Sequence, residues 1–424
     1  MKKRILIVGG GLAGLSCATQ LHEAGVESLI LESSDGVGGR VRTDAVQGFL
    51  LDRGFQVYLS AYPEAGRQLD LEALDLRRFN PGALVFRGGK LLRMMDVFRC
   101  PQYALSTAFQ PIGTIWDKLR VGRMRFRATR TALDEIAAHK DDTTEEYLRR
   151  SGFSESMIDG FFRPFYGGIF LERDLRTSSR MFEFTFKMFA EGHATLPAKG
   201  MQEIPRQLAN RLPMNAIRLD APVRSVEART VTLENGEQVT ADAVVVATDA
   251  GTAARLVSGT QKIPTGWRST TSIYYSAPSS PLKEAIIALN GHTSGLVNNV
   301  CVPSDVSADY APEGGALISV SLLGLPDSKD LESRVQAELE TWFGKEVRQW
   351  EHLRTYRIPH ALPEQPPSDS REKGNGFQVH DEIYVCGDHC TSASIEGALV
   401  SGMCVAKDIV AGNPASGGAQ RTGS

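Results

Sequence analysis

The sequence predicts an α/β protein: a doubly wound, Rossmann-like nucleotide-binding domain assembled from discontinuous segments, plus an α+β domain with a mixed sheet and helices. Residues 4–32 read as strand, glycine turn, helix and strand, which is one βαβ unit. The apolar run 383–386 precedes a helical pattern at 394–410 and forms a further strand–helix unit. Alternating and apolar runs between 268 and 325 predict the second sheet.

The elements between these landmarks follow from their periodicity. Residues 71–193 are rich in Arg, Phe and Met and show helical spacing, notably at 114–139. Strand patterns return at 216–233, and a hairpin is expected to turn at 234–237. An amphipathic helix is expected at 330–343.

The composition excludes several classes of protein. The chain has 424 residues, 42% hydrophobic and 23% charged, so it is neither disordered, collagenous nor a coiled coil. Lys plus Arg number 47 and Asp plus Glu 50, which argues against a dedicated nucleic-acid binder. The six scattered cysteines predict a reducing, cytoplasmic location. No apolar run reaches the roughly 18–20 residues that span a bilayer, so membrane contact is expected to be peripheral at most.

The first turn carries a dinucleotide-binding pattern. Residues 9–14 read Gly-Gly-Gly-Leu-Ala-Gly, a G-x-G-x-x-G between strand and helix. Gly9 permits the tight turn, Gly11 lets the backbone approach a pyrophosphate, and Gly14 allows close helix–strand packing. Glu32, at the end of the second strand, is placed to accept ribose hydroxyls. The cofactor-binding set predicted here is completed by Leu12, Ala13 and Ser33.

A second glycine-rich segment follows that strand. It contains Gly38, Gly39 and Arg40, a backbone that can close over phosphate with the guanidinium as a bidentate cation. The alternative is that Arg40 is a solvated loop residue.

These motifs resemble those of a known superfamily. Residues 32–43, with Glu32 and the Gly-Gly-Arg run, resemble the signature of flavin-dependent amine oxidases, protoporphyrinogen oxidases and carotenoid (phytoene) desaturases. The strand and Gly-Asp at 383–388, followed by the helix start at 394–402, are similar to the segment that covers the flavin end of FAD there. Residues 52–63 are similar to a stretch of plant and cyanobacterial-type desaturases.

The resemblance implies noncovalent FAD and assigns further residues to it. Gly387 and Asp388 are implied near the ribityl–phosphate portion, and Val223 near adenine. The isoalloxazine is implied to lie along Gly54, Phe55 and Gln56. Its pyrimidine edge is implied to lie against Ser394, Ile395 and Ala398.

The resemblance also implies how the chain is divided. An FAD-binding domain is expected from three separated stretches, and a substrate domain from a helical part and a mixed-sheet part. The three FAD-binding stretches are 1–70, 196–260 and 366–411, the substrate domain is 71–195 with 261–365, and a disordered tail is 412–424.

Motifs that the sequence lacks narrow the chemistry. No second G-x-G-x-x-G follows a strand, so no NAD(P)H lobe is expected, and electrons would leave to oxygen or a quinone. No Ser-Gly-Gly-Cys-Tyr is present, so covalent flavin attachment is not predicted. Cys386 and Cys390 lack a second ligand pair, so no metal site is predicted.

The implied activity is hydride transfer from a hydrophobic, isoprenoid- or polyene-like substrate to flavin N5. Oxidation of a primary or secondary amine is the alternative. A noncatalytic FAD-binding chaperone or scaffold is the alternative of another class. A long apolar tunnel would favour desaturation, and an aromatic cage facing the flavin would favour amine oxidation.

No residue is predicted as a catalytic acid or base, because the flavin carries the hydride chemistry. The polar stretch 354–363 precedes the final FAD segment, where the resemblance implies that residues of the substrate domain approach the flavin. Tyr356 and His360 are therefore candidates to line the substrate pocket, and Arg357 to hold an anionic group. The alternative is interdomain packing and surface exposure.

Two further segments each allow two interpretations. The aromatic run at 161–170 is either a tunnel wall or ordinary core. The segment 115–133 reads as a basic amphipathic helix that binds an anionic membrane surface, or as a solvated face over the helical domain. The arginines on its stripe are Arg120, Arg123, Arg127 and Arg130.

Overall fold

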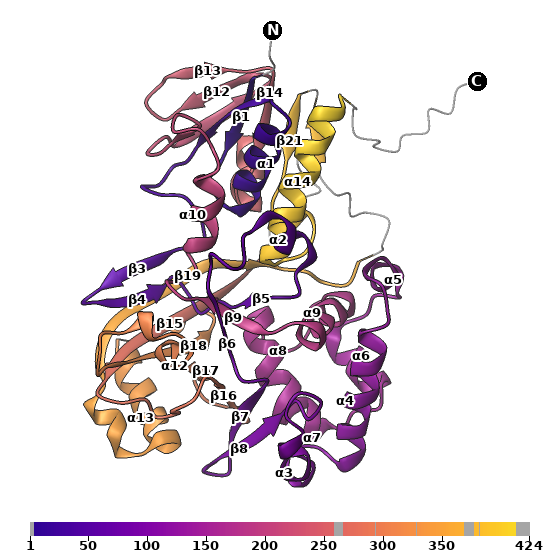
Figure 1. The fold of residues 1–424 in the computed structure, drawn as a ribbon, viewed down its shortest axis with the longest axis vertical. Helices are drawn as coiled ribbons and strands as arrows, with labels where there is room; N and C mark the ends of the chain where they lie inside the picture. Colours follow the sequence, from indigo (N-terminus) through magenta and orange to yellow (C-terminus); the bar gives the residue numbers. More distant parts are fainter. Residues whose placement is uncertain are drawn as a thin grey trace.

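The computed structural model has an upper lobe that holds both ends of the described chain and a lower lobe of sheet and helices (Figure 1). It describes residues 4–257, 266–292, 294–327, 329–368, 377–380 and 382–412. The predicted tail at 412–424 lies outside the described residues apart from Gly412.

The upper lobe is built on a six-stranded sheet whose strands come from three distant parts of the chain. All neighbours are parallel except the last pair. The strand order is β10 (Ile217–Arg218), β2 (Glu27–Leu31), β1 (Arg4–Val8), β14 (Ala243–Val246), β21 (Ile383–Val385) and β20 (Phe377–His380).

Both faces of this sheet are covered. Ile5 and Ile7 pack into one core with α1 (Leu12–Glu23) and α14 (Ile395–Ala411). Leu6 and Val8 face a second core under a three-stranded meander. The meander and its neighbouring helix are β11 (Val223–Glu227), β12 (Thr230–Leu233), β13 (Gln238–Thr240) and α11 (Ala250–Leu256). The strands therefore read as continuous apolar runs, as expected for a parallel sheet buried on both sides.

The lower lobe contains a seven-stranded mixed sheet in which one pair, β16–β7, is parallel. Helix α13 (Leu331–Phe343) packs on one face through Val335, Leu339 and Trp342. The strand order is β19 (Glu351–Pro363), β15 (Trp267–Ala277), β18 (Ala316–Leu323), β17 (Val297–Cys301), β16 (Ile287–Asn290), β7 (Gly82–Arg87) and β8 (Lys90–Met95). The predicted doubly wound domain and mixed-sheet domain are both confirmed.

The helices of the lower lobe pack around an aromatic core. Phe162, Tyr166, Phe170 and Phe182 are each at most 2% exposed, so the aromatic run at 161–170 contributes to packing. The helices are α3 (Ala104–Phe109), α4 (Ile115–Ala128), α5 (Leu133–Ala138), α6 (Thr144–Arg150), α7 (Glu155–Met157), α8 (Arg163–Phe170) and α9 (Ser179–Glu191).

The single helix predicted over 115–133 is two helices, because α4 ends at Ala128. The hydroxyls of Thr129 and Thr131 donate to the carbonyls of Phe126 and Arg127, at 3.1 and 3.0 Å. Such local side-chain bonds compete with continuation of a helix.

The remaining short elements are β3 (Thr43–Val46), β4 (Phe49–Asp52), β5 (Tyr58–Leu59), α2 (Pro63–Gln68), β6 (Leu76–Arg78), β9 (Ala194–Pro197), α10 (Glu203–Ala209) and α12 (Pro303–Val306). They include a two-stranded sheet of β3 and β4 and a three-stranded sheet in the order β5, β9 and β6.

Candidate cofactor site

The turn between β1 and α1 leaves open space where a ligand needs it. A Cβ on Gly9, whose φ is +108°, would lie 2.8 Å from the Ala247 carbonyl oxygen, and one on Gly14 would lie 2.1 Å from the Gly9 oxygen. A Cβ on Gly11 would meet nothing within 4 Å. Helix α1, whose first turn includes Leu12 and Ala13, has no side-chain cap, so its amide groups face this space.

Glu32 fixes the loop beside this turn. Its buried carboxylate accepts hydrogen bonds from the Gly10 amide at 2.6 Å and from the Ser34 amide and hydroxyl at 2.9 and 2.7 Å. The Ser33 hydroxyl donates to the same group at 3.4 Å. At the far side, the Ala221 amide donates to the Glu32 carbonyl at 2.8 Å, which places buried Val223 next to this end of β2.

The second glycine segment lies over the first. The Gly38 amide donates to the Gly10 carbonyl at 2.8 Å. A Cβ on Gly39 would lie 3.4 Å from the Gly11 Cα. Gly38 and Gly39 have φ values of +118° and +58°, which glycine adopts readily. The two turns therefore enclose one backbone-lined space.

Arg40 joins this space to the last segment of the chain. Its guanidinium pairs with Asp388 at 2.6 Å and donates to the Ala361 carbonyl at 3.1 Å. The guanidinium lies 5.4 Å from the Trp267 ring centroid, and Trp267 in turn stacks on His360 at 5.2 Å. Arg40 is thus held by partners from both lobes.

His389 is the clearest sign that the site needs a ligand. Its ring is buried beside Asp388, and neither ring nitrogen has a hydrogen-bond partner among the residues that the structure describes. Burial lowers the pKa of His389 and so favours the neutral ring. A Cβ on Gly387 would lie 2.4 Å from this ring, so the chain turns tightly here. Buried polar atoms seldom stay unpaired in a complete site.

The segment around Gly54 meets the lower lobe. Gly54 has a φ of +93°, and a Cβ there would lie 2.8 Å from the Ile358 side chain of β19. Gln56 donates to the Arg40 carbonyl at 2.9 Å, and the ring of Phe55 packs edge-on against Phe79 at 6.4 Å.

The start of α14 approaches the same region and brings a functional residue that the sequence analysis missed. Ser394 caps the helix by accepting from the Gly397 amide at 2.9 Å, and Ile395 and Ala398 pack on the core beneath it. Glu396 turns inward and accepts from the Glu64 and Ala65 amides that open α2, at 2.8 and 2.9 Å. Burial raises the pKa of Glu396. The sequence feature that could have identified Glu396 is an acidic residue in the first turn of a helix.

The strand β19 places the three substrate-pocket candidates on different sides. Tyr356 lies on the face toward Asp44. His360 lies in a stretch where the register of β19 shifts, and it stacks on Trp267, the ring that also contacts Arg40. Arg357 lies on the other face and donates to the Leu325 and Pro326 carbonyls. The structure therefore brings Tyr356 and His360, but not Arg357, to the interface between the lobes.

Tyr356 belongs to a charged cluster. Its hydroxyl donates to Asp44 at 2.7 Å, and Arg53 and Arg354 pair with the same carboxylate at 2.9 and 3.3 Å. Burial opposes ionisation of Asp44, but the hydrogen bonds from Arg53 and Tyr356 lower its pKa. Burial, followed by the bond to Asp44, raises the pKa of Tyr356 to about 12.

Asp52 is a second residue that the sequence analysis did not single out. It is buried, and it accepts from Thr43 at 2.6 Å, Tyr310 at 2.9 Å and the Met201 amide at 3.0 Å. Burial raises its pKa to about 6 despite these three donors. The sequence feature that could have identified Asp52 is its position directly before the Arg-Gly at 53–54.

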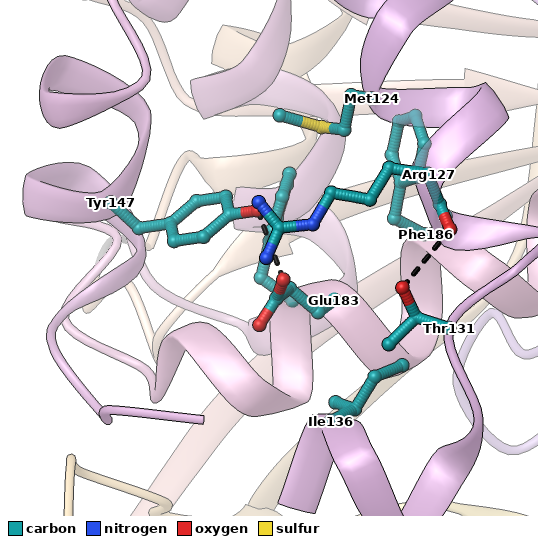
Figure 2. Close-up of a pocket in the computed structure, with 9 residues that line it drawn as sticks. Met124, Arg127, Thr131, Ile136, Tyr147, Glu183 and Phe186 are labelled. Carbon is teal, nitrogen blue, oxygen red and sulfur yellow. Dashed lines mark hydrogen bonds between the residues drawn. The ribbon is translucent and has the colours of Figure 1, made fainter. Parts of the chain in front are cut away.

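A separate cavity lies among the helices of the lower lobe (Figure 2). Figure 2 shows Arg127 reaching across it toward Tyr147 and Glu183, whose side chains are hydrogen-bonded at 3.0 Å. Its volume is about 20 Å³, room for one water molecule. The space is too small for an organic substrate, and its lining includes none of the predicted cofactor residues.

The chain matches a known protein family over nearly its whole length. The model of the family described as flavin containing amine oxidoreductase matches residues 12–410. The chain belongs to this family. Membership of this family makes the chain a flavin-dependent oxidoreductase, and its cofactor is FAD.

The names of two relatives of this flavin-containing amine oxidoreductase indicate different reactions. Polyamine oxidase 2 of Arabidopsis thaliana is 26% identical over 279 residues, 61% of this chain and 52% of that protein. Carotenoid phi-ring synthase of Streptomyces griseus is 26% identical over 301 residues, 65% and 58% of the two chains. The chain covers less than two thirds of the length of either relative.

Solved structures share the fold. A putrescine oxidase superposes with a TM-score of 0.76 at 16% identity, over 97% of this chain and 100% of that one. A protein named putative protoporphyrinogen oxidase from Exiguobacterium superposes with a TM-score of 0.73 at 18% identity, over 97% and 100%.

The residues present fit FAD. The open space above Gly11, the uncapped first turn of α1, the Arg40 cation and the unpaired ring of His389 suit a long, anionic ligand with many hydrogen-bonding atoms. Among the described residues no cluster of three metal-ligating side chains occurs. In the same part of the chain no helix has the length and hydropathy needed to cross a bilayer.

Proposed function

We propose that the chain is an FAD-dependent oxidoreductase that takes hydride from a C–H bond of a hydrophobic, isoprenoid- or polyene-like substrate. The observation that carries the cofactor part of the proposal is the Arg40–Asp388 pair, which joins the first and last cofactor segments. The charge pattern between the lobes carries the substrate part. FAD, when bound, supplies the hydride acceptor.

The chain's own residues bind and orient that cofactor. In this proposal the amides of residues 9–14 and the Arg40 guanidinium hold the pyrophosphate, and Glu32 and Ser33 hold the adenosine ribose. Val223 lies against adenine, and Asp388 with Gly387 holds the ribityl chain. Gly54, Phe55, Gln56 and the start of α14 at Ser394, Ile395 and Ala398 line the flavin. Since the amides at the start of α14 carry partial positive charge, they stabilise negative charge on the reduced ring.

The charge pattern at the interface supports an uncharged substrate. Asp44 is already paired with two arginines and a tyrosine, Asp388 with Arg40, and Asp52 is enclosed by three donors. A substrate ammonium would have to displace one of these partners, whereas an apolar substrate leaves them in place. Tyr356 and His360 then serve as walls beside the flavin, and Arg357 has no role in the pocket.

Oxidation of an amine is the second candidate. The 26% identity to polyamine oxidase 2 and the fold shared with putrescine oxidase support it. The family leaves oxygen or a quinone as electron acceptor in both cases. The six free cysteines support a reducing, cytoplasmic location.

The test is anaerobic reduction of the bound flavin. The purified, FAD-loaded protein is mixed without oxygen with a short polyene or with a primary or secondary amine, and its visible absorption is followed. We expect bleaching by the polyene and return of the bands on adding oxygen or a quinone. Bleaching by the amine alone would replace the substrate proposal with the amine alternative.

Failure of both substrate classes, with a flavin that dithionite still reduces, would favour the noncatalytic scaffold. Acid precipitation before the assay separates noncovalent FAD, expected in the supernatant, from covalent flavin in the pellet. An Arg40→Gln variant should lose FAD, while the matched Arg334→Gln, an exposed arginine on α13, should keep it.

A further inference from the structure

Large apolar side chains are exposed mainly on one part of the molecule. Eleven are exposed among the described residues, and seven of these lie between positions 98 and 126. Scattered exposed residues are ordinary, but a contiguous group marks an interaction surface. The seven, called here the α3–α4 face, are Phe98, Leu105, Phe109, Ile115, Trp116, Leu119 and Phe126.

Helix α4 buries a carboxylate and exposes several large apolar side chains. Its one buried residue is Asp117, whose carboxylate accepts from Thr114 and from the Ser154 amide and hydroxyl at 2.6 to 2.9 Å. Trp116 and Leu119, in contrast, are 66% and 59% exposed. Polar contacts therefore anchor the first turn, and half-buried apolar side chains on the inner side of α4 pack on the aromatic core. A second set of large apolar side chains points to solvent.

The exposed side chains form one continuous stripe. Ile115, Leu119, Gly122 and Phe126 are spaced by four, three and four residues, so they share one side of the helix. The ring of Phe98 lies 3.4 Å from the Cβ position of Gly122 and fills the gap between them.

Helix α3 continues this face. The Lys118 ammonium donates to the Ala108 and Gln110 carbonyls at 2.9 and 2.8 Å, which ties the end of α3 to the first turn of α4. The two helices lie together at the lower edge of the molecule (Figure 1).

The same side of α4 is cationic. Between Ile115 and Arg130 the chain has six cationic side chains and one acid, and the acid is the buried Asp117. Arg123 and Arg130 are exposed and form no ion pair with a described acid, whereas Arg127 reaches into the cavity of Figure 2. Helical spacing puts Arg123 beside the apolar stripe. Arg130 lies just beyond α4, and its guanidinium is 3.4 Å from the ring centroid of Phe126.

We propose that the α3–α4 face docks on an anionic lipid bilayer. Apolar side chains enter the acyl boundary and the arginines meet the headgroups, so one surface satisfies both features. Trp and Phe suit the interfacial depth. A symmetric contact with a second copy would bring the arginine rows face to face without acids between them. This proposal is independent of the substrate.

The test is co-sedimentation of the FAD-loaded full chain with phosphatidylcholine/phosphatidylserine vesicles. We expect binding at low salt and release at ~1 M salt, where the Debye length is about 3 Å. The double variant Arg123→Gln/Arg130→Gln should bind about 30-fold more weakly, since each cation near such a surface contributes about fivefold. Trp116→Ser/Leu119→Ser should also weaken binding.

The control is Arg334→Gln/Lys407→Gln, which removes the same charge from α13 and α14 and should bind like wild type. Retained flavin absorption and an unchanged Tm show that each variant is folded. Equal binding of the two double charge variants, or no binding of wild type, would overturn the proposal. Sedimentation velocity without lipid tests the alternative of a second copy. A dimer that the Trp116→Ser/Leu119→Ser variant dissociates would overturn the bilayer proposal in favour of self-association.

Discussion

Gly402 is the point where the two helices of the cofactor lobe come closest. A Cβ at this position would lie 2.1 Å from the Ala13 carbonyl oxygen and 3.0 Å from the Cys17 amide nitrogen. Ordinary contact begins at 3.4 Å, so Gly402→Ala must push α14 more than 1 Å away from α1. Backbone cannot yield as a flexible side chain does, because both helices are buried between sheet and neighbours.

We expect Gly402→Ala to destabilise the fold by about 1–3 kcal/mol, the usual cost of overpacking. At about 2–4 °C per kcal/mol for a domain of this size, the Tm falls by about 2–12 °C. FAD affinity falls as well, because α1 carries the glycine turn and α14 the flavin end. Circular dichroism melts with and without added FAD, and titration of apoprotein with FAD, measure both effects.

Gly66→Ala is the matched control. It makes the same change in helix α2, where a Cβ meets nothing within 4 Å, so the Tm should stay or rise slightly. If Gly402→Ala matched this control in Tm and in FAD affinity, the close approach of α1 and α14 would be refuted.

Three further outcomes are expected. Glu32→Gln removes the charge that holds the first turn and should weaken FAD binding at least tenfold, measured by flavin release on dilution. Burial raises the pKa of Asp52 to about 6, so its neutral form stabilises the fold below pH 3.8, and this contribution is lost as pH rises to about 6. Thermal melts of wild type and Asp52→Asn across that pH range test whether the wild type loses stability in this direction. Tyr356→Phe loses its bond to ionised Asp44 and should cost about 1.5–3 kcal/mol without changing the flavin spectrum, and a changed spectrum with unchanged Tm would contradict that role.

Local patterns account for what the sequence predicts well. The βαβ start, the meander turn at 234–237 and helix α13 each depend on glycine placement or periodicity within a few residues. The glycine turn is visible in sequence for the same reason, since Gly9 and Gly14 are required by atoms close along the chain or in the adjoining strand.

Long-range pairing accounts for what the sequence did not predict. Strands β7 and β8 lie inside the stretch expected to be helical, and β7 pairs with β16, two hundred residues later in the chain. The turn Arg87-Gly88-Gly89-Lys90 is a hairpin signal that the sequence analysis did not use. Glu396 caps a helix 331 residues away, a contact that no local pattern encodes.

The order of strands in the upper sheet has a consequence for how the cofactor is acquired. Strand β1 is made first, its neighbour β14 after some 240 residues, and β21 with helix α14 only beyond residue 383. During synthesis the glycine turn therefore emerges long before the groups that face it across the pocket. A nascent chain can hold at most part of FAD, so loading follows translation, and a stop codon before residue 383 leaves a protein without a closed cofactor pocket.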